Sequence, residues 1–140
     1  MKKALIIYNS KTGITKKFSN EIGNFCIQSG LNSKVLSIDE FNSDTLLDFD
    51  YLFLGSWTHG LMILFQHPDT NWVEFAKTLP DLNGKKIVLF TTYKLATGSM
   101  FNKMKKQIKC ESGDIVLELK SRDGSLGKAN ASLLKRVFSN

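Results

Sequence analysis

Short apolar segments alternate with segments of helical periodicity along the chain, and this alternation restricts the folds that the chain can adopt. The strong strand-like segments cover residues 4–8, 51–55, 87–91 and 115–119, and a weaker one covers residues 34–38. The first three are almost continuously apolar, which is typical of parallel strands buried on both faces. We therefore expect three central strands, with the weaker segments at the edges of a sheet.

The segments between these strands carry apolar side chains at the spacing of a helix. The four expected stripes are Ile14, Phe18, Ile22, Phe25 and Cys26; Trp72, Phe75, Ala76 and Leu79; Phe101, Met104 and Ile108; and Leu133, Leu134, Val137 and Phe138. Strands that alternate with helices of this length favour βαβ units with right-handed crossovers. The sequence therefore predicts an α/β fold with a doubly wound sheet and helices on both faces.

The composition fits one folded domain spanning residues 1–140. The chain is 42% hydrophobic and 23% charged, so it has enough apolar surface to fold without a metal or a disulfide. Its two cysteines, Cys26 and Cys110, lack the close spacing of zinc or dithiol sites. We expect two free thiols, with Cys26 in the core, and no metal site.

Neither a membrane span nor a signal peptide is expected. Lys2 and Lys3 precede an apolar run too short for a signal sequence, and no apolar stretch approaches the roughly 18 residues of a membrane helix. A cytoplasmic location is the resulting expectation. The formal net charge of +6 favours acidic partners or surfaces, but it does not by itself indicate nucleic-acid binding, and we expect none.

A loop rich in hydroxyl groups joins the first strand to the first helix. Ser10, Thr12 and Thr15 surround Gly13 where the helix should begin. Unpaired backbone N–H groups and the positive end of the helix dipole favour an anion there, and small hydroxyl side chains can donate to phosphate oxygens. The loop predicts a phosphate site, although an ordinary capped turn uses the same residue types. The absence of G-x-G-x-x-G and G-x-x-x-x-G-K-[ST] patterns disfavours a dinucleotide or a nucleoside triphosphate.

The pattern [ST]-x-T-G-x-T at residues 10–15, after an apolar first strand, resembles the FMN-phosphate loop of flavodoxins. Residues 53–60 resemble the second flavin loop of that family, and residues 90–93 with Gly98 stand where the third belongs. The resemblance extends from the first strand to the terminal helix. It implies a flavodoxin-like three-layer α/β/α sandwich with a five-stranded parallel sheet in the order 2-1-3-4-5.

The resemblance also implies which residues hold FMN. In the family, the second and third loops clasp the isoalloxazine ring, often with an aromatic side chain on a face of the ring. Trp57 and Tyr93 are the candidates for this contact, although aromatic residues at strand ends also pack beneath loops. His59 could form a hydrogen bond near the flavin or be a surface residue, and no catalytic residue is expected. The implied FMN-binding residues are Ser10, Lys11, Thr12, Gly13, Ile14, Thr15, Ser56, Trp57, Thr58, His59, Gly60, Thr91, Thr92, Tyr93 and Gly98.

Two features depart from the family pattern. Many electron-carrying flavodoxins are acidic and have carboxylates after the second loop, whereas this chain is basic and continues with apolar residues 61–65. This run could begin a buried helix, which we favour, or form an exposed lip over the flavin. The four lysines within residues 103–109 are expected to form a solvated helix face, with a docking patch as the alternative.

An FMN-binding electron carrier is the function that the sequence favours. The protein would act at low potential between a reductase and an acceptor enzyme, and its redox partner proteins would present acidic docking surfaces. One alternative is a flavodoxin-like FMN-dependent reductase or dehydrogenase acting on a quinone, a tetrapyrrole or a similar flat substrate. The other is a flavin-free binding module of the same fold. Steady turnover with NAD(P)H would indicate the first alternative, and a protein that stays colourless after incubation with FMN would indicate the second.

Overall fold

Five parallel strands form the centre of the fold in the computed structural model, which describes residues 1–61 and 64–140. They are β1 (Lys3–Asn9), β2 (Asn32–Ser37), β3 (Tyr51–Leu61), β5 (Lys86–Thr92) and β6 (Ile115–Ser121). Their order in the sheet is β2-β1-β3-β5-β6, and each neighbouring pair is parallel. Numbered among themselves along the chain, these strands have the predicted order 2-1-3-4-5.

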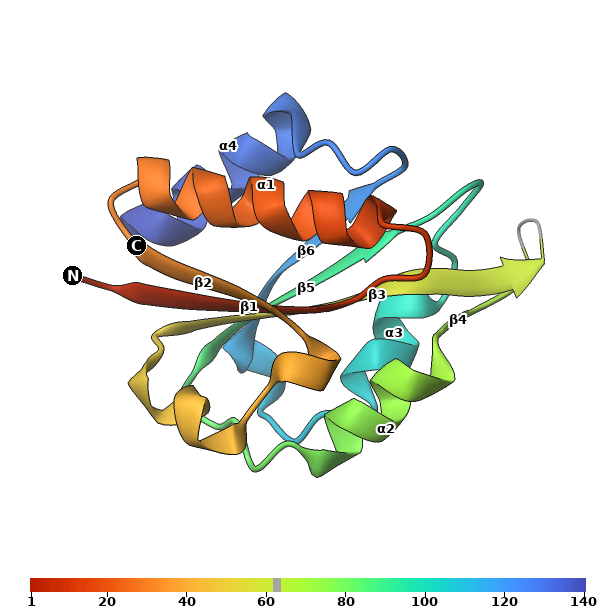
Figure 1. The fold of residues 1–140 in the computed structure, drawn as a ribbon, viewed down its shortest axis with the longest axis horizontal. Helices are drawn as coiled ribbons and strands as arrows, with labels where there is room; N and C mark the ends of the chain where they lie inside the picture. Colours follow the sequence, from red (N-terminus) through yellow and green to blue (C-terminus); the bar gives the residue numbers. More distant parts are fainter. Residues whose placement is uncertain (62–63) are drawn as a thin grey trace.

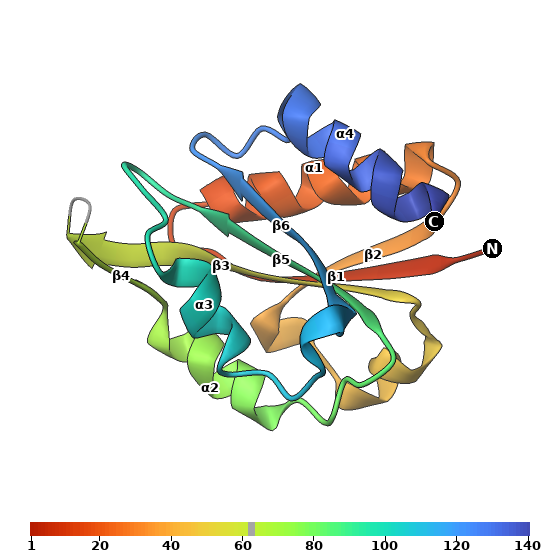
Figure 2. The ribbon, with the colours of Figure 1, turned by 180° about the vertical axis from the view of Figure 1, so that it is seen from behind.

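Helices cover both faces of this sheet, as Figures 1 and 2 show. The helices α1 (Ile14–Gln28) and α4 (Gly127–Ser139) lie on one face, and α2 (Thr70–Thr78) and α3 (Met100–Lys105) lie on the other. Short 3-10 segments at Ile38–Glu40, Ser43–Asp48 and Ser112–Asp114 lie in the connections. The arrangement confirms the predicted three-layer α/β/α sandwich.

The side chains of β1 alternate between two hydrophobic clusters, one on each face of the sheet. Leu5 and Ile7 pack in the cluster that includes the apolar residues of α2 and α3. Ala4 and Ile6 pack in the cluster that includes those of α1 and α4. All four side chains are fully buried. A strand that is apolar on both faces can be buried in this way only between two helical layers.

The structure differs from the sequence prediction in two of the helices. Ile14, which was expected on the buried face of α1, is 39% exposed, because the first turn of the helix lies at the rim of a cavity. The helix α3 ends at Lys105, so Ile108 lies beyond it, although its side chain is still buried in the core.

Two of the four lysines within residues 103–109 contact other parts of the protein. The ammonium of Lys103 donates to the backbone oxygen of Gln66 at 2.7 Å, and that of Lys105 lies 2.5 Å from the carboxylate of Glu118.

An antiparallel arm extends one end of the sheet and was not predicted. The strand β4 (Leu64–Pro68) pairs with the last residues of β3, and Figure 1 shows the two strands projecting past the rest of the sheet. The prediction that residues 61–65 begin a buried helix is therefore wrong. Leu61 ends β3, Leu64 begins β4, and Phe65 is 74% exposed. Residues 62–63 of that predicted run lie outside the described residues.

Across residues 1–61 and 64–140, no helix combines the length and the hydrophobicity that a membrane crossing requires.

Candidate cofactor site

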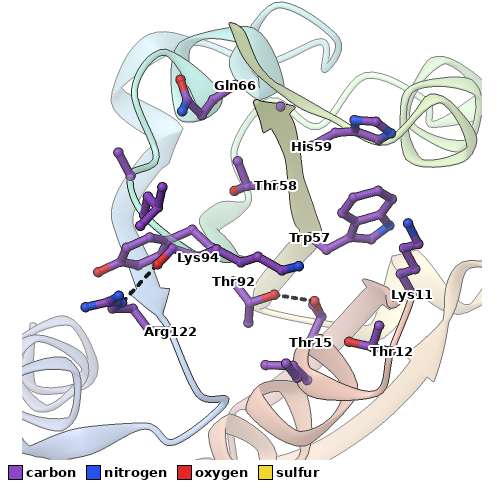
Figure 3. A pocket seen from close by; sticks show the side chains of 15 residues that line it. Lys11, Thr12, Thr15, Trp57, Thr58, His59, Gln66, Thr92, Lys94 and Arg122 are labelled. Carbon is purple, nitrogen blue, oxygen red and sulfur yellow. Dashed lines mark hydrogen bonds between the residues drawn. The ribbon is translucent and has the colours of Figure 1, made fainter. Parts of the chain in front are cut away.

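Three loops meet at the carboxyl edge of the sheet and surround a cavity of about 510 Å³, which Figure 3 shows from close by. The first and third loops follow β1 and β5. The predicted second flavin loop, residues 53–60, is not a loop in the structure but lies within β3, and the name second loop is kept here for residues 56–60 of that strand. The strands β1, β3 and β5 are neighbours in the sheet and run in the same direction. Ligands of open parallel sheets bind at this edge, and the volume lies within the usual range for small-molecule sites. The predicted site residues that line the cavity are Lys11, Thr12, Ile14, Thr15, Trp57, Thr58, His59, Gly60, Thr92 and Tyr93.

The first loop is shaped by the hydroxyl group of Ser10. Its oxygen accepts the backbone N–H groups of Gly13 at 3.1 Å and Lys16 at 3.3 Å, so the hydroxyl proton can still be donated to a ligand. Gly13 has φ of 94° and precedes α1 without providing a side-chain cap. A β-carbon at Gly13 would have no neighbour within 4 Å, so the backbone of the loop is open to a ligand.

Ser10 and Gly13 do not line the main cavity. They line a second cavity of about 290 Å³, together with Tyr8 and residues 37–39. Burial raises the pKa of the Tyr8 hydroxyl, and the nearby carboxylate of Glu40 raises it further. The first loop therefore borders two cavities: Thr12 and Thr15 line the main one, and Ser10 lines the second.

Thr15 connects the first loop to the third. Its Oγ1 lies 2.6 Å from Oγ1 of Thr92 at the end of β5, and both side chains are buried. Because each hydroxyl is paired with the other, Thr15 is largely committed to holding the two loops together. Its backbone N–H, in the first turn of α1, has the position in which helix termini bind anions.

The second loop is held by a chain of hydroxyl hydrogen bonds. Thr91 donates to the backbone oxygen of Ser56 at 2.6 Å, so its single proton is used there. Oγ1 of Thr58 lies 2.7 Å from Oγ1 of Thr91 and must therefore be the donor of that bond. The Thr58 oxygen keeps its lone pairs for an acceptor role at the cavity. Ser56 and Thr91 are fully buried and support the loop from beneath.

Ser56 also ties the second loop to α2. Its hydroxyl donates to the backbone oxygen of Trp57 at 3.0 Å and accepts the N–H of Asp69 at 3.3 Å. Asp69 is the N-cap of α2, and its carboxylate accepts from Asn71 and from the Asn9 side chain, which ends β1. The ends of β1 and β3 are thus linked through one capped helix terminus.

Trp57 stands at the rim of the cavity among polar neighbours. The ammonium of Lys11 lies 5.0 Å from the centre of the Trp57 rings, and the His59 ring lies 4.6 Å from them. His59 in turn stacks on His67 at 4.7 Å with the two rings nearly parallel. A flat ligand that stacks on Trp57 must share the indole with Lys11 and His59 or displace one of them.

The third loop approaches the antiparallel arm. Tyr93 is half-buried at the cavity, and the ammonium of Lys120 lies 5.8 Å from the centre of its ring. Gly98 does not line the cavity. Its φ is 51°, and a β-carbon there would lie 2.5 Å from Oε1 of the buried Gln66. Gly98 therefore allows the third loop to lie close against β4.

Five further residues line the cavity although the sequence did not single them out: Gln66, Lys94, Leu95, Ala96 and Arg122. Lys94, Leu95 and Ala96 directly follow Tyr93, so their place in the third loop was a usable signal. Arg122 follows the end of β6, which also ends at this edge of the sheet. Gln66 lies on β4, whose pairing with β3 the sequence did not predict. Among the described lining residues there are three permanent cations, Lys11, Lys94 and Arg122, and no carboxylate.

The donor set fits a phosphate ester attached to a flat ring. The first loop offers the N-terminus of α1, small hydroxyl groups and an open glycine backbone to a phosphate. The main cavity beside it has one aromatic side chain from each of the other two loops, Trp57 and Tyr93. These features are those that FMN requires, because FMN combines one phosphate with a flat ring.

Comparison with known proteins gives a consistent result. Residues 5–118 match the family model described as "Flavodoxin domain". A flavodoxin of Clostridium beijerinckii is 33% identical over 88 residues, a match that spans 63% of this chain and 62% of that protein.

Solved structures of flavodoxins share the fold. The solution structure of two-electron reduced Megasphaera elsdenii flavodoxin superimposes with a TM-score of 0.77 at 22% identity, covering 94% of each chain. Oxidised flavodoxin 2 of Bacillus cereus superimposes with a TM-score of 0.71 at 20% identity, covering 96% of this chain and 94% of that one. Flavodoxins are FMN-binding proteins that transfer electrons to partner proteins. With a family match that extends from β1 into β6, this chain belongs to the flavodoxin domain family.

Proposed function

We propose that this chain binds one FMN non-covalently and passes electrons at low potential from a reductase to an acceptor enzyme. The observation that carries the proposal is the meeting of three loops at one edge of the sheet. The first has the chemistry of a phosphate site, and the other two present Trp57 and Tyr93 at an adjoining cavity of about 510 Å³. Bound FMN would supply the redox chemistry, and the protein would supply binding, shielding and electrostatic tuning.

Each residue of the first loop would offer a different donor to the phosphate. The hydroxyl of Ser10 has a proton to donate, and the side chain of Thr12 is exposed at the cavity. Thr15 would contribute mainly its backbone N–H, since its hydroxyl is paired with Thr92. Lys11 adds a positive charge within the same loop, which favours a doubly charged phosphate ester.

The surface around the cavity supports a partner protein with an acidic docking surface. Lys11, Lys94 and Arg122 are exposed at the mouth of the cavity, and no carboxylate lies among its described lining residues. Leu95 in the third loop lines the cavity and is 56% exposed, and Phe65, which precedes the lining residue Gln66 on β4, is 74% exposed. Exposed apolar side chains with a charged rim are typical of protein docking surfaces. Cytoplasmic residence is part of the proposal, and the two free thiols suit a reducing compartment.

The replacement Thr12→Ala tests the phosphate assignment. A lost hydrogen bond to a charged group costs about 1.5–3 kcal/mol, so the affinity for FMN should fall by about one to two decades. Riboflavin lacks the phosphate, and its affinity should change much less. Thr70→Ala, at an exposed threonine of α2, is the matched control and should leave both affinities unchanged.

Both affinities are measured by titrating apoprotein and following flavin fluorescence. An equal loss of FMN and riboflavin affinity in Thr12→Ala would remove Thr12 from the phosphate site. A purified protein that binds no flavin would contradict the proposed function. Steady oxidation of NAD(P)H in the absence of any protein partner would favour a reductase over a carrier.

A further inference from the structure

The cations that line the cavity differ in what their charged groups contact. The Lys11 ammonium lies over the Trp57 rings at 5.0 Å. Nε of Arg122 donates to the backbone oxygen of Lys94 at 3.1 Å, which fixes the guanidinium beside the third loop. The ammonium of Lys94 forms no ion pair or hydrogen bond with any of the residues that the structure describes. Because the charge of Lys11 is assigned to the phosphate, Lys94 is the lining cation that remains for the flavin ring.

The side chain of Lys94 is directed across the cavity. Figure 3 shows it extending from the third loop, above Thr92, towards the side of the cavity that Trp57 forms. The backbone here is held at two neighbouring residues: Nε of Arg122 donates to the Lys94 carbonyl oxygen, and the N–H of Tyr93 donates to the carbonyl oxygen of Ser121 at 3.2 Å. The side chain of Lys94 therefore extends from a fixed backbone into the cavity.

We propose that the Lys94 ammonium lies against the ring of bound FMN and favours the uptake of the second electron. This inference rests on the proposed function. Oxidised FMN has an uncharged ring, whereas complete reduction at neutral pH leaves negative charge on it. A cation beside the ring therefore stabilises the fully reduced cofactor more than the oxidised one. Lys94 raises the second one-electron potential, and the first loop binds the phosphate.

The size of the effect follows from the position of the charge. Lys94 is exposed, so water and salt weaken its field compared with that of a buried charge. The flavin ring would cover part of the ammonium and lower the local dielectric constant, so the interaction should exceed that of a pair at the open surface. We expect a preference of about tenfold, which equals about 59 mV for a one-electron couple.

The experiment compares Lys94→Gln with Lys135→Gln in the FMN-loaded protein. Lys135 is an exposed residue in the second half of α4, which Figure 1 places at the opposite edge of the sheet, so both variants lose the same charge. Potentiometric titration should show the second one-electron potential of Lys94→Gln lower by about 59 mV, the first potential much less changed, and Lys135→Gln like the original protein. Lys94→Arg, which keeps the charge, should restore most of the difference.

Flavin affinities distinguish a contact of Lys94 with the flavin ring from a contact with the phosphate. Oxidised FMN and oxidised riboflavin should both bind Lys94→Gln within about twofold of their affinities for the original protein. A tenfold loss for FMN without a loss for riboflavin would place Lys94 at the phosphate and overturn the inference. Equal potential shifts in the Lys94 and Lys135 variants would show that only net charge matters and would also overturn it. A protein that binds no flavin overturns the proposed function and this inference together, whereas normal binding with an unshifted potential overturns this inference alone.

Discussion

The buried pair of threonine hydroxyls that joins the first loop to the third provides a direct test of how the site is held together. Oγ1 of Thr15, at the start of α1, lies 2.6 Å from Oγ1 of Thr92, at the end of β5. The side chains are 1% and 5% exposed, so neither hydroxyl has ready access to water. The perturbation is the replacement of one or both by valine, which keeps the shape and removes the hydroxyl.

The expected cost depends on whether one hydroxyl or both are removed. Thr15→Val alone leaves the Thr92 hydroxyl buried without this partner, and Thr92→Val does the reverse. Leaving a buried donor or acceptor unsatisfied costs about 1–3 kcal/mol, whereas replacing both partners by apolar groups of the same shape is nearly neutral. The double variant should therefore be more stable than the sum of the single variants implies, with a coupling free energy of about 1–3 kcal/mol.

Urea unfolding of the apoprotein, followed by circular dichroism, measures this coupling. With a denaturant slope of about 2 kcal/mol per molar urea, each single variant should lower the midpoint by about 0.5–1.5 M. Thr70→Val, at an exposed position of α2, is the control and should shift the midpoint little. Additive losses in the double variant would show that the two hydroxyls do not depend on each other, and the account of the loop connection would fail.

Two further predictions concern single side chains. The variant Trp72→Phe leaves Trp57 as the remaining tryptophan. Adding FMN to its apoprotein should quench the indole emission, because Trp57 would lie against the flavin. Unchanged emission would show that Trp57 does not contact the flavin. Burial raises the pKa of Cys26 to about 12, so that at pH 8 it remains a protonated, inaccessible thiol. A thiol reagent should modify Cys110 in the folded protein and Cys26 only in urea. Rapid modification of both thiols in the folded protein would contradict the described core.

The parallel sheet could be predicted because its central strands are apolar on both faces. Residues such as Leu5 and Ile6 of β1 point to opposite clusters and are both fully buried, and this requirement is visible in the sequence as an uninterrupted apolar run. The three loops of the site followed from the same reasoning, because the carboxyl ends of parallel strands meet at one edge. Thr15 was predicted from the first of these loops, and Trp57 from the resemblance to the second flavin loop of flavodoxins; both line the cavity.

The antiparallel arm could not be predicted, because the sequence of residues 60–65 contains none of the dipeptides that mark tight hairpins. Gly60 has φ of 147°, and a β-carbon there would lie 2.9 Å from the backbone oxygen of Phe65. A lone glycine in an apolar run does not reveal such a close crossing. Gln66 was missed for this reason, since it enters the cavity from β4. Arg122 was not predicted because it follows an edge strand, β6, whereas the predicted loops follow the three central strands.

The register of the sheet has a consequence for the unfolding equilibrium. Ala4 pairs with Tyr51, and Tyr51 pairs with Lys86, so the first, second and third loops are brought together only by pairings between segments far apart in the chain. The unfolded chain therefore has no preformed binding site, and a ligand of this edge binds the native state alone. Such a ligand shifts the equilibrium by mass action, by about 2.7 kcal/mol when its free concentration is 100 times its dissociation constant. The thermal midpoint of the protein should therefore rise with the concentration of free FMN.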